Sequence, residues 1–181
     1  MEETGTQAVT DDLLRVRSLT RAGDITGLVV QLRNPAESGM LSVRSAAARA
    51  LGQLRADDAV EPLAALLGDE NADVRISAVR SLGRIGSPGA VPHLLTALGD
   101  GAPAVREWAV DSLGYHADPR AVTALIRLLD SDDPKIRLVA VRALGRVGDR
   151  MARRRLRALR AGSDLRLRWW RARALWRIRR H

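Results

Sequence analysis

The stretch VRISAVRSLGRI, residues 74–85, decides the fold, because its apolar residues follow the period of an α-helix. Four of them stand four, four and three positions apart and so share one helix face: Val74, Ala78, Leu82 and Ile85. A second apolar stripe follows in AVPHLLTALGD, residues 90–100. Gly83, Gly86 and Pro88 predict the end of the first helix and a turn before the second. Together the two stretches predict a helical hairpin.

The first-helix stretch recurs along the chain at a constant spacing of 31 residues. Its other copies are VRSAAARALGQL from Val43, VREWAVDSLGYH from Val105, IRLVAVRALGRV from Ile136 and LRWWRARALWRI from Leu167. Self-similarity at a fixed period is typical of a solenoid, in which each unit buries its apolar face against its neighbours. The sequence therefore predicts an all-α fold, a right-handed alpha solenoid of about five helical-hairpin repeats. The first helices are expected at 43–54, 74–85, 105–116 and 136–147.

The repeat also sets the predicted domain organisation. A disordered tail is expected over residues 1–10, followed by one repeat domain over 11–181. Within it the predicted parts are an irregular N-terminal unit at 11–42, repeats at 43–73, 74–104, 105–135 and 136–166, and an Arg/Trp-rich capping helix at 167–181.

The recurring pattern VRxxAxxxLGxxGxxxAVxxLxxxLxD resembles the HEAT-like repeats of the phycobilisome-lyase type and the designed alpha-repeat proteins related to them. The resemblance implies a protein-binding scaffold, with scattered enzymes among the relatives. Deoxyhypusine hydroxylases of this superfamily carry His-Glu metal pairs, whereas His93, His116 and His181 have no adjacent glutamate here. We therefore expect no catalytic residues, no metal site and no cofactor.

Charge is distributed unevenly along the chain. Residues 1–135 hold 14 basic and 19 acidic side chains, whereas residues 136–181 hold 16 arginines and two aspartates. The basic C-terminal end is thus a candidate for contact with an anionic partner. There is no cysteine, which excludes disulfides and thiolate metal sites. The acidic, polar first residues differ from a signal peptide and no apolar run reaches the length of a membrane span, so a soluble, cytoplasmic protein is expected.

Plotted at 100° per residue, the first helix has a repetitive core side and a variable opposite side. The variable side is expected to point outward. From the first repeat to the last it reads Ser45, Ala46, Arg49, Gln53; Ile76, Ser77, Arg80, Arg84; Glu107, Trp108, Asp111, Tyr115; Leu138, Val139, Arg142, Arg146; and Trp169, Trp170, Arg173, Arg177.

Four of the five aromatic residues fall on this variable side, and Trp, Tyr and Arg are enriched at binding hot spots. In the designed relatives the same helix lines a concave groove, which implies a binding groove here. The alternative is that these side chains only cover one another. The predicted binding residues are Ile76, Arg80, Arg84, Glu107, Trp108, Asp111, Tyr115, Leu138, Arg142, Arg146, Trp169, Trp170, Arg173 and Arg177.

The C-terminal repeat permits three interpretations. It is a cap, with or without an acidic protein partner; a nucleic-acid surface of guanidinium and indole groups; or, least favoured, an amphipathic helix on an anionic membrane. Trp176 stands where the four preceding repeats have glycine. The preferred function is a non-enzymatic scaffold for a protein or peptide, followed by nucleic-acid binding and then by an accessory lyase-type enzyme.

A second periodic feature is arginine at the second position of each first helix, preceded by acidic turns. It predicts a structural ladder of ion pairs and helix caps. The arginines are Arg44, Arg75, Arg106, Arg137 and Arg168, and the acidic residues include Asp69, Asp73, Asp100 and Asp133.

Overall fold

The structure, a computed structural model, describes residues 2–33, 43–160, 162 and 164–179, with side chains from residue 10 onward. Within these ranges the regular structure is all helical, with no strand. The chain divides into two compact units, residues 1–87 (unit 1) and residues 88–181 (unit 2). The sequence predicted one repeat domain from residue 11.

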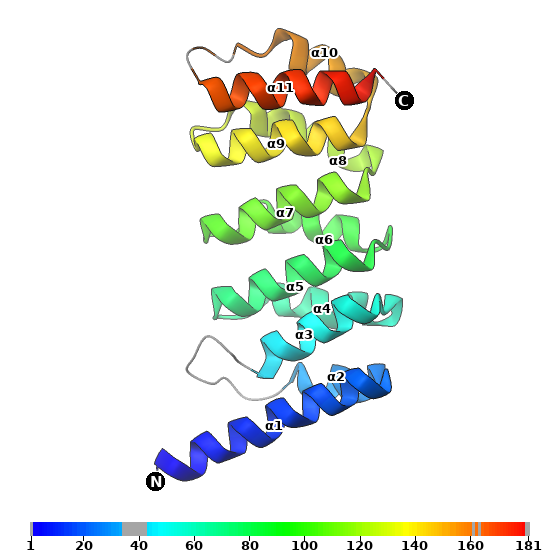
Figure 1. The fold of residues 1–181 in the computed structure, drawn as a ribbon, viewed down its shortest axis with the longest axis vertical. Helices are drawn as coiled ribbons and strands as arrows, with labels where there is room; N and C mark the ends of the chain where they lie inside the picture. Colours follow the sequence, from blue (N-terminus) through cyan, green and yellow to red (C-terminus); the bar gives the residue numbers. More distant parts are fainter. Residues whose placement is uncertain (1, 34–42, 161, 163, 180–181) are drawn as a thin grey trace. The chain divides into compact units, whose positions relative to one another are not determined.

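Unit 1 contains the N-terminal helix, a short second helix and the first complete hairpins. Its elements are α1 (Glu2–Ala22), α2 (Ile25–Gln31), α3 (Val43–Leu54), the 3₁₀ turn Asp57–Ala59, α4 (Val60–Ala65), the 3₁₀ turn Leu66–Gly68 and α5 (Ala72–Ile85). α3 packs along α5, and α1 and α2 both pack on α3 (Figure 1). The core is formed by fully buried side chains that include Leu28, Leu51, Leu63 and Leu82.

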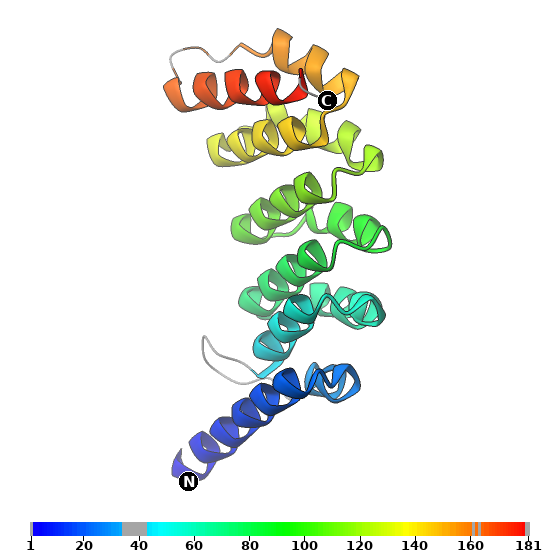
Figure 2. The same cartoon turned by 45° about the vertical axis from the view of Figure 1, so that its right-hand side comes forward.

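Within the described residues, unit 2 contains two complete hairpins, preceded by one second helix and followed by one first helix. Its elements are α6 (Ala90–Ala97), α7 (Pro103–His116), α8 (Pro119–Arg127), the 3₁₀ turn Leu128–Asp130, α9 (Pro134–Val147), α10 (Arg150–Ala158) and α11 (Leu165–Ile178). The first helices α7, α9 and α11 pack side by side in one layer, and α6, α8 and α10 form a second layer against them (Figures 1 and 2). Buried leucines fill the space between the layers, among them Leu94, Leu113, Leu125, Leu144 and Leu156.

The predicted first helices are confirmed, and three of them start two residues earlier than the repeat pattern indicated. Pro103 and Pro134 occupy the first turn of α7 and α9, where a missing N–H costs no helical hydrogen bond. The Asn71 side chain accepts a hydrogen bond from the Asp73 N–H at the start of α5, and Asp133 caps α9 in the same way.

Two expectations about local structure differ from what is observed. Gly83 lies inside α5, and the helix ends at Gly86, whose φ of 79° suits a residue without a Cβ. The sequence also predicted a disordered tail over residues 1–10, whereas α1 begins at Glu2. Val16 of α1 is buried and belongs to the core of unit 1.

Glycine at the tenth position of the first helix has a packing role in place of a helix-breaking one. A Cβ added at Gly52 would lie 2.7 Å from the Cα of Ser81, and one added at Gly114 would lie 2.6 Å from the Cα of Ala143. At Gly145 the added Cβ would lie 2.6 Å from the Cβ of Ala174. Consecutive first helices within a unit therefore approach closely because a glycine on one meets a small residue on the next.

The predicted arginine ladder is present, but most of its acceptors are backbone carbonyls. Arg75 donates to the carbonyl oxygens of Asp69 and Glu70 at 2.7 and 3.1 Å. The same pair of bonds recurs from Arg106 to residues 100 and 101 and from Arg137 to residues 131 and 132. Arg44 makes the predicted ion pair, a two-bond contact with Asp69 at 2.9 and 3.2 Å. The arginines thus tie the preceding loop to the start of each helix.

Candidate binding surface

The variable side of α7, α9 and α11 carries most of the predicted binding residues of unit 2. Trp108, Tyr115 and Trp169 are 38%, 66% and 56% exposed, which is high for large aromatic side chains. Trp170 is half-buried and lies edge-on to Trp169, with ring centroids 4.7 Å apart. Glu107 and Leu138 are half-buried. Aromatic side chains on this side are therefore available to a partner, except where they pack on one another.

Asp111 links α7 to α9 at the centre of this surface. Its Oδ1 accepts a hydrogen bond from Nη1 of Arg146 at 2.7 Å and lies 3.8 Å from Nη2 of Arg142. The Asp111 and Arg146 side chains are only 17% and 15% exposed, so the pair is shielded from water and its attraction is stronger than that of a surface pair. One carboxylate thus serves two guanidinium groups.

The same arginines lie over aromatic rings. The guanidinium carbon of Arg146 is 4.0 Å from the centroid of the Tyr115 ring, and that of Arg142 is 5.0 Å from the Trp170 ring. Arg173 lies 5.4 Å from the Trp169 ring and 6.0 Å from the Trp170 ring. Cation–π contacts of this length hold rings and guanidinium groups in fixed relative positions.

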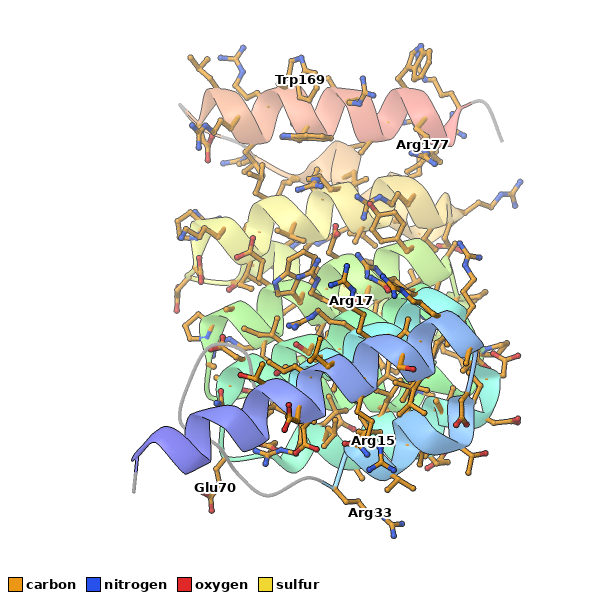
Figure 3. The ribbon with its side chains drawn as sticks, turned by 60° about the horizontal axis from the view of Figure 1, so that its bottom comes forward. Arg15, Arg17, Arg33, Glu70, Trp169 and Arg177 are labelled. Atoms are coloured by element: carbon orange, nitrogen blue, oxygen red, sulfur yellow. The ribbon has the colours of Figure 1, made fainter. Side chains whose placement is uncertain are left out.

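These side chains surround a pocket of about 420 Å³, called here the unit 2 pocket. Its lining is Gly114, Tyr115, Ala117, Arg142, Gly145, Arg146, Trp170, Arg173, Ala174 and Arg177. The floor consists of Gly114, Gly145 and Ala174, which are the small residues of the close helix approach. Figure 3 shows Arg177 on the side of α11 that faces α9, away from Trp169 (Figure 3).

The unit 2 pocket is positively charged. It is lined by four arginines, and Asp111 beside it supplies one negative charge. No hydrogen bond or ion pair joins Arg173 or Arg177 to a carboxylate in the part of the chain that the structure describes. Two guanidinium groups at the pocket are therefore available to an anionic group of a ligand.

The sequence pattern placed three residues on the wrong side of their helices. Ser45, Ser77 and Val139 were predicted to point outward, but they are 1%, 5% and 4% exposed. The variable side is therefore narrower than the helical wheel indicated, because neighbouring first helices cover its edges.

The predicted residues of unit 1 lie on α5. Ile76 and Arg80 are half-buried and Arg84 is exposed. They belong to a different unit from Trp108 and Leu138, so the continuity of the predicted groove stays a prediction.

The floor of the unit 2 pocket was missed by the sequence analysis. The sequence pattern did not single out Gly114, Gly145 or Ala174, because a small residue has no chemical signature of binding. The available signal was their position, since small residues on adjacent helices leave a depression between the larger side chains around them.

At the C-terminal end, two arginines have structural partners. Arg171 donates to the carbonyl oxygen of Leu159 at 2.6 Å, which ties α11 to the end of α10. Arg155 of α10 makes a two-bond contact with Asp130 at 2.6 and 2.7 Å. These contacts fit the interpretation of this region as a cap.

Trp176 supports the same interpretation. It is 55% exposed and stands at the position where Gly52, Gly114 and Gly145 meet the next first helix. A further repeat packed on α11 with the same close approach would collide with the indole ring.

No group of three or more His, Asp or Glu side chains is positioned within the described ranges to hold a metal ion. None of the described helices combines the length and apolar character required to cross a membrane.

Comparison with solved structures supports the fold. An engineered protein is 23% identical over 99% of this chain and 92% of its own, with a TM-score of 0.64. The complex of CpcE and CpcF of phycocyanin lyase from Nostoc sp. matches at 23% identity over 90% of this chain and 68% of its own, with a TM-score of 0.65. A designed armadillo repeat protein in complex with the peptide (KR)4 matches at 18% identity, 97% and 92% coverage and a TM-score of 0.66.

At these identities the structural matches show the fold alone. A comparison with curated protein sequences finds no match. The family profile described as HEAT repeats matches residues 26–102 and 91–176, which together span most of the chain. The repeats, the two-layer packing of helical hairpins and the profile agree: the chain belongs to the family of HEAT repeat proteins and is an alpha solenoid.

Proposed function

We propose that the protein is a non-enzymatic scaffold that binds an acidic peptide, or an acidic segment of a partner protein, at the unit 2 pocket. The observation that carries this proposal is a pair of guanidinium groups without carboxylate partners, Arg173 and Arg177, beside the aromatic walls formed by Tyr115 and Trp170. Arginine pairs with a carboxylate through two parallel hydrogen bonds, which gives orientation as well as attraction.

The size and composition of the pocket fit one or two side chains of an extended ligand. A volume of about 420 Å³ lies in the range of small-ligand sites. The exposed face of Tyr115 and the half-buried Trp170 offer apolar contact area with few rotatable bonds, so that little conformational entropy is lost on binding. Arginine and aromatic residues are also the types that dominate binding energy at protein interfaces.

A structural relative suggests the same mode with the opposite charge. The designed armadillo repeat protein is complexed with (KR)4, a basic peptide. The basic character of the unit 2 pocket favours an acidic peptide on a comparable repeat fold.

The proposal is tested by selecting ligands from a displayed library of random peptides and measuring their affinity by fluorescence anisotropy. The selected peptides should be enriched in Asp and Glu. Arg173→Glu combined with Arg177→Glu should weaken their binding by at least about tenfold, since charge-assisted hydrogen bonds are lost and repulsion is introduced. Arg127→Glu is the matched control, because Arg127 is an exposed arginine on α8 outside the pocket. Selection of basic or uncharged peptides, or equal loss in the control, would contradict the proposal.

A second candidate function is nucleic-acid binding by α11. Trp169 and Trp176 are more than half exposed on this arginine-rich helix, and indole rings stack on bases while guanidinium groups contact phosphates. Binding to random-sequence RNA or DNA would then weaken by on the order of a thousandfold between about 50 and 200 mM salt if six or more phosphates are contacted. A flat titration at low salt with folded protein would remove this candidate and leave the acidic peptide.

A further inference from the structure

Unit 1 contains a second pocket, which is chemically distinct from the one in unit 2. It has a volume of about 450 Å³ and lies between α1 and α3. Its lining is Arg17, Thr20 and Arg21 of α1 with Ala46, Arg49, Ala50 and Gln53 of α3. No aromatic residue lines it. We call it the Arg17–Arg49 pocket.

Helical spacing brings these side chains together. Arg17 and Arg21 are four residues apart and therefore share one face of α1. Arg49 and Gln53 share a face of α3 by the same rule, and the small Ala46 and Ala50 on that face leave the space. The opposite face of α3 is used for the core, so this polar face is free to meet α1.

The arginines of this pocket lack acidic partners. No hydrogen bond or ion pair joins Arg17, Arg21 or Arg49 to a carboxylate within the residues that the structure describes. The Thr20 hydroxyl donates its proton to the carbonyl oxygen of Val16 at 2.6 Å, so the arginines are the main hydrogen-bond donors that this pocket offers to a ligand. The pocket is therefore a concentration of N–H donors and positive charge.

Arg49 also lies close to a fourth positive charge. Burial lowers the pKa of the Arg49 guanidinium, and the charge of Arg80 on α5 lowers it further. Like charges in a partly desolvated position repel one another, and an anion bound between the two helices would relieve that repulsion.

We infer that the Arg17–Arg49 pocket is a binding site for the phosphate group of a phosphomonoester. Three arginines from two helices line one space of molecular size. A carboxylate brings one charge and two oxygens, which one or two arginines satisfy. A phosphomonoester brings nearly two charges and three terminal oxygens, which matches three arginines. The site uses residues of unit 1 alone and is independent of the proposed peptide site in unit 2.

The experiment titrates the full chain with inorganic phosphate, with O-phosphoserine and with malonate, and follows binding by isothermal titration calorimetry. We expect saturable binding of both phosphates. Malonate carries a similar charge on two separate planar carboxylates, and it should bind at least about tenfold more weakly because its oxygens are not gathered on one tetrahedral centre that three guanidinium groups can share. A phosphoserine peptide compared with free O-phosphoserine identifies the source of the phosphate. Tighter binding of the peptide indicates a phosphorylated protein segment, and equal affinity indicates a small phosphate ester; both support the site.

Variants identify the residues. Arg17→Ala, Arg21→Ala and Arg49→Ala should each weaken phosphate binding by about tenfold or more, the effect of losing a charge-assisted hydrogen bond. Arg15→Ala is the matched control, because Arg15 is an exposed arginine on the opposite side of α1 from Arg17 (Figure 3). Circular dichroism verifies that each variant is folded. If Arg49→Ala is poorly folded, Arg49→Lys replaces it in the test; this variant keeps the positive charge and should retain part of the affinity for phosphate.

Three results would overturn the inference. They are the absence of saturable phosphate binding to folded protein, malonate binding as tight as phosphate, or an equal effect of Arg15→Ala and Arg17→Ala. The result is separable from the peptide proposal, because Arg173→Glu with Arg177→Glu should leave phosphate binding by unit 1 unchanged.

Discussion

The pockets of unit 1 and unit 2 both contain arginines from the variable side of a first helix, but those arginines have different neighbours. In unit 2, Arg142 and Arg146 share the carboxylate of Asp111 and lie over the rings of Trp170 and Tyr115. In unit 1, Arg49 occupies the position equivalent to Arg142 and is surrounded by alanines and further arginines.

The difference shows that an arginine column does not define a ligand by itself. A guanidinium group that is paired with a carboxylate and lies over a ring is fixed in position and has part of its charge neutralised. The ring beside it offers aromatic surface to a ligand. A group of arginines without a carboxylate contributes charge, and its most favourable ligand is a compact anion with several oxygens. The unit 2 pocket combines two arginines held by Asp111 and the rings with Arg173 and Arg177, which have no carboxylate partner among the described residues, and we assign an acidic peptide to it. The lining of the unit 1 pocket, as far as the structure describes it, has neither the rings nor the carboxylate, and we assign a phosphate group to it.

The largest effect on stability is expected from the helix approach that forms the floor of the unit 2 pocket. Gly145→Ala would place a Cβ 2.6 Å from the Cβ and 2.8 Å from the Cα of Ala174, and α11 would have to shift. We expect a loss of about 1–3 kcal/mol in the free energy of unfolding, measured by urea denaturation.

In unit 1, Gly52→Ala should have a similar effect, because its Cβ would lie 2.7 Å from the Cα of Ser81. Gly68→Ala is the control, since nothing lies within 4 Å of a Cβ at that position. Helix propensity alone favours alanine over glycine by about 1 kcal/mol. A gain in stability for Gly145→Ala would therefore show that the close approach does not limit packing.

A second substitution should make the unit 2 pocket resemble the unit 1 pocket, in which the arginines have no carboxylate partner among the described residues. Asp111→Asn removes the carboxylate and leaves the shielded Arg146 without its ion-pair partner. The expected loss in unfolding free energy is about 1–2 kcal/mol, because the pair is mostly but not fully buried.

The same variant should bind phosphate in unit 2 more tightly than the wild type does, detected as a quenching of tryptophan fluorescence at lower phosphate concentrations. Asp130→Asn is the control, because the Asp130 side chain is 65% exposed and its pair with Arg155 is expected to contribute about 0.2–1 kcal/mol. If the two variants lose equal stability, Asp111 does not hold the pocket together.

The smallest effect is expected from the exposed rings of α7. Trp108→Ala and Tyr115→Ala should change the unfolding free energy by less than about 1 kcal/mol, since exposed side chains remove little surface from water. Trp170→Ala should cost more, because Trp170 is half-buried and contacts Trp169 and Arg142. A loss above about 3 kcal/mol for Trp108→Ala, the size of emptying a core aromatic position, would assign that ring to the core.

Most of the fold could be predicted from the sequence because each repeat presents the same local signals. The spacing of Val74, Ala78 and Leu82 defines a helix face without reference to the rest of the chain. The first helices were predicted within two residues of their observed ends. The error at Gly83 had a local cause, since glycine near the end of an apolar stripe predicts a turn, whereas α5 continues to Ile85 and ends at Gly86.

The candidate sites were less predictable. The sequence pattern drew attention to Trp108, Tyr115 and the arginines of α9 and α11, and the structure brings several of them around one pocket. The sequence pattern gave no reason to pair Arg17 and Arg21 with Arg49. Residues 11–42 do not follow the 31-residue repeat, and the packing of α1 on α3 is a long-range contact. Ser45, Ser77 and Val139 were assigned to the outside because a helical wheel treats one helix at a time.

The sequence by itself determined the repeat, the helical hairpins, the uneven charge and the aromatic residues of the variable side, because these depend on local spacing and composition. The tertiary structure alone decided which arginine meets a carboxylate, which meets a ring and which remains available to an anion. These outcomes depend on distances of 3–5 Å between side chains on different helices, where one helix supplies the charge and its neighbour supplies the partner.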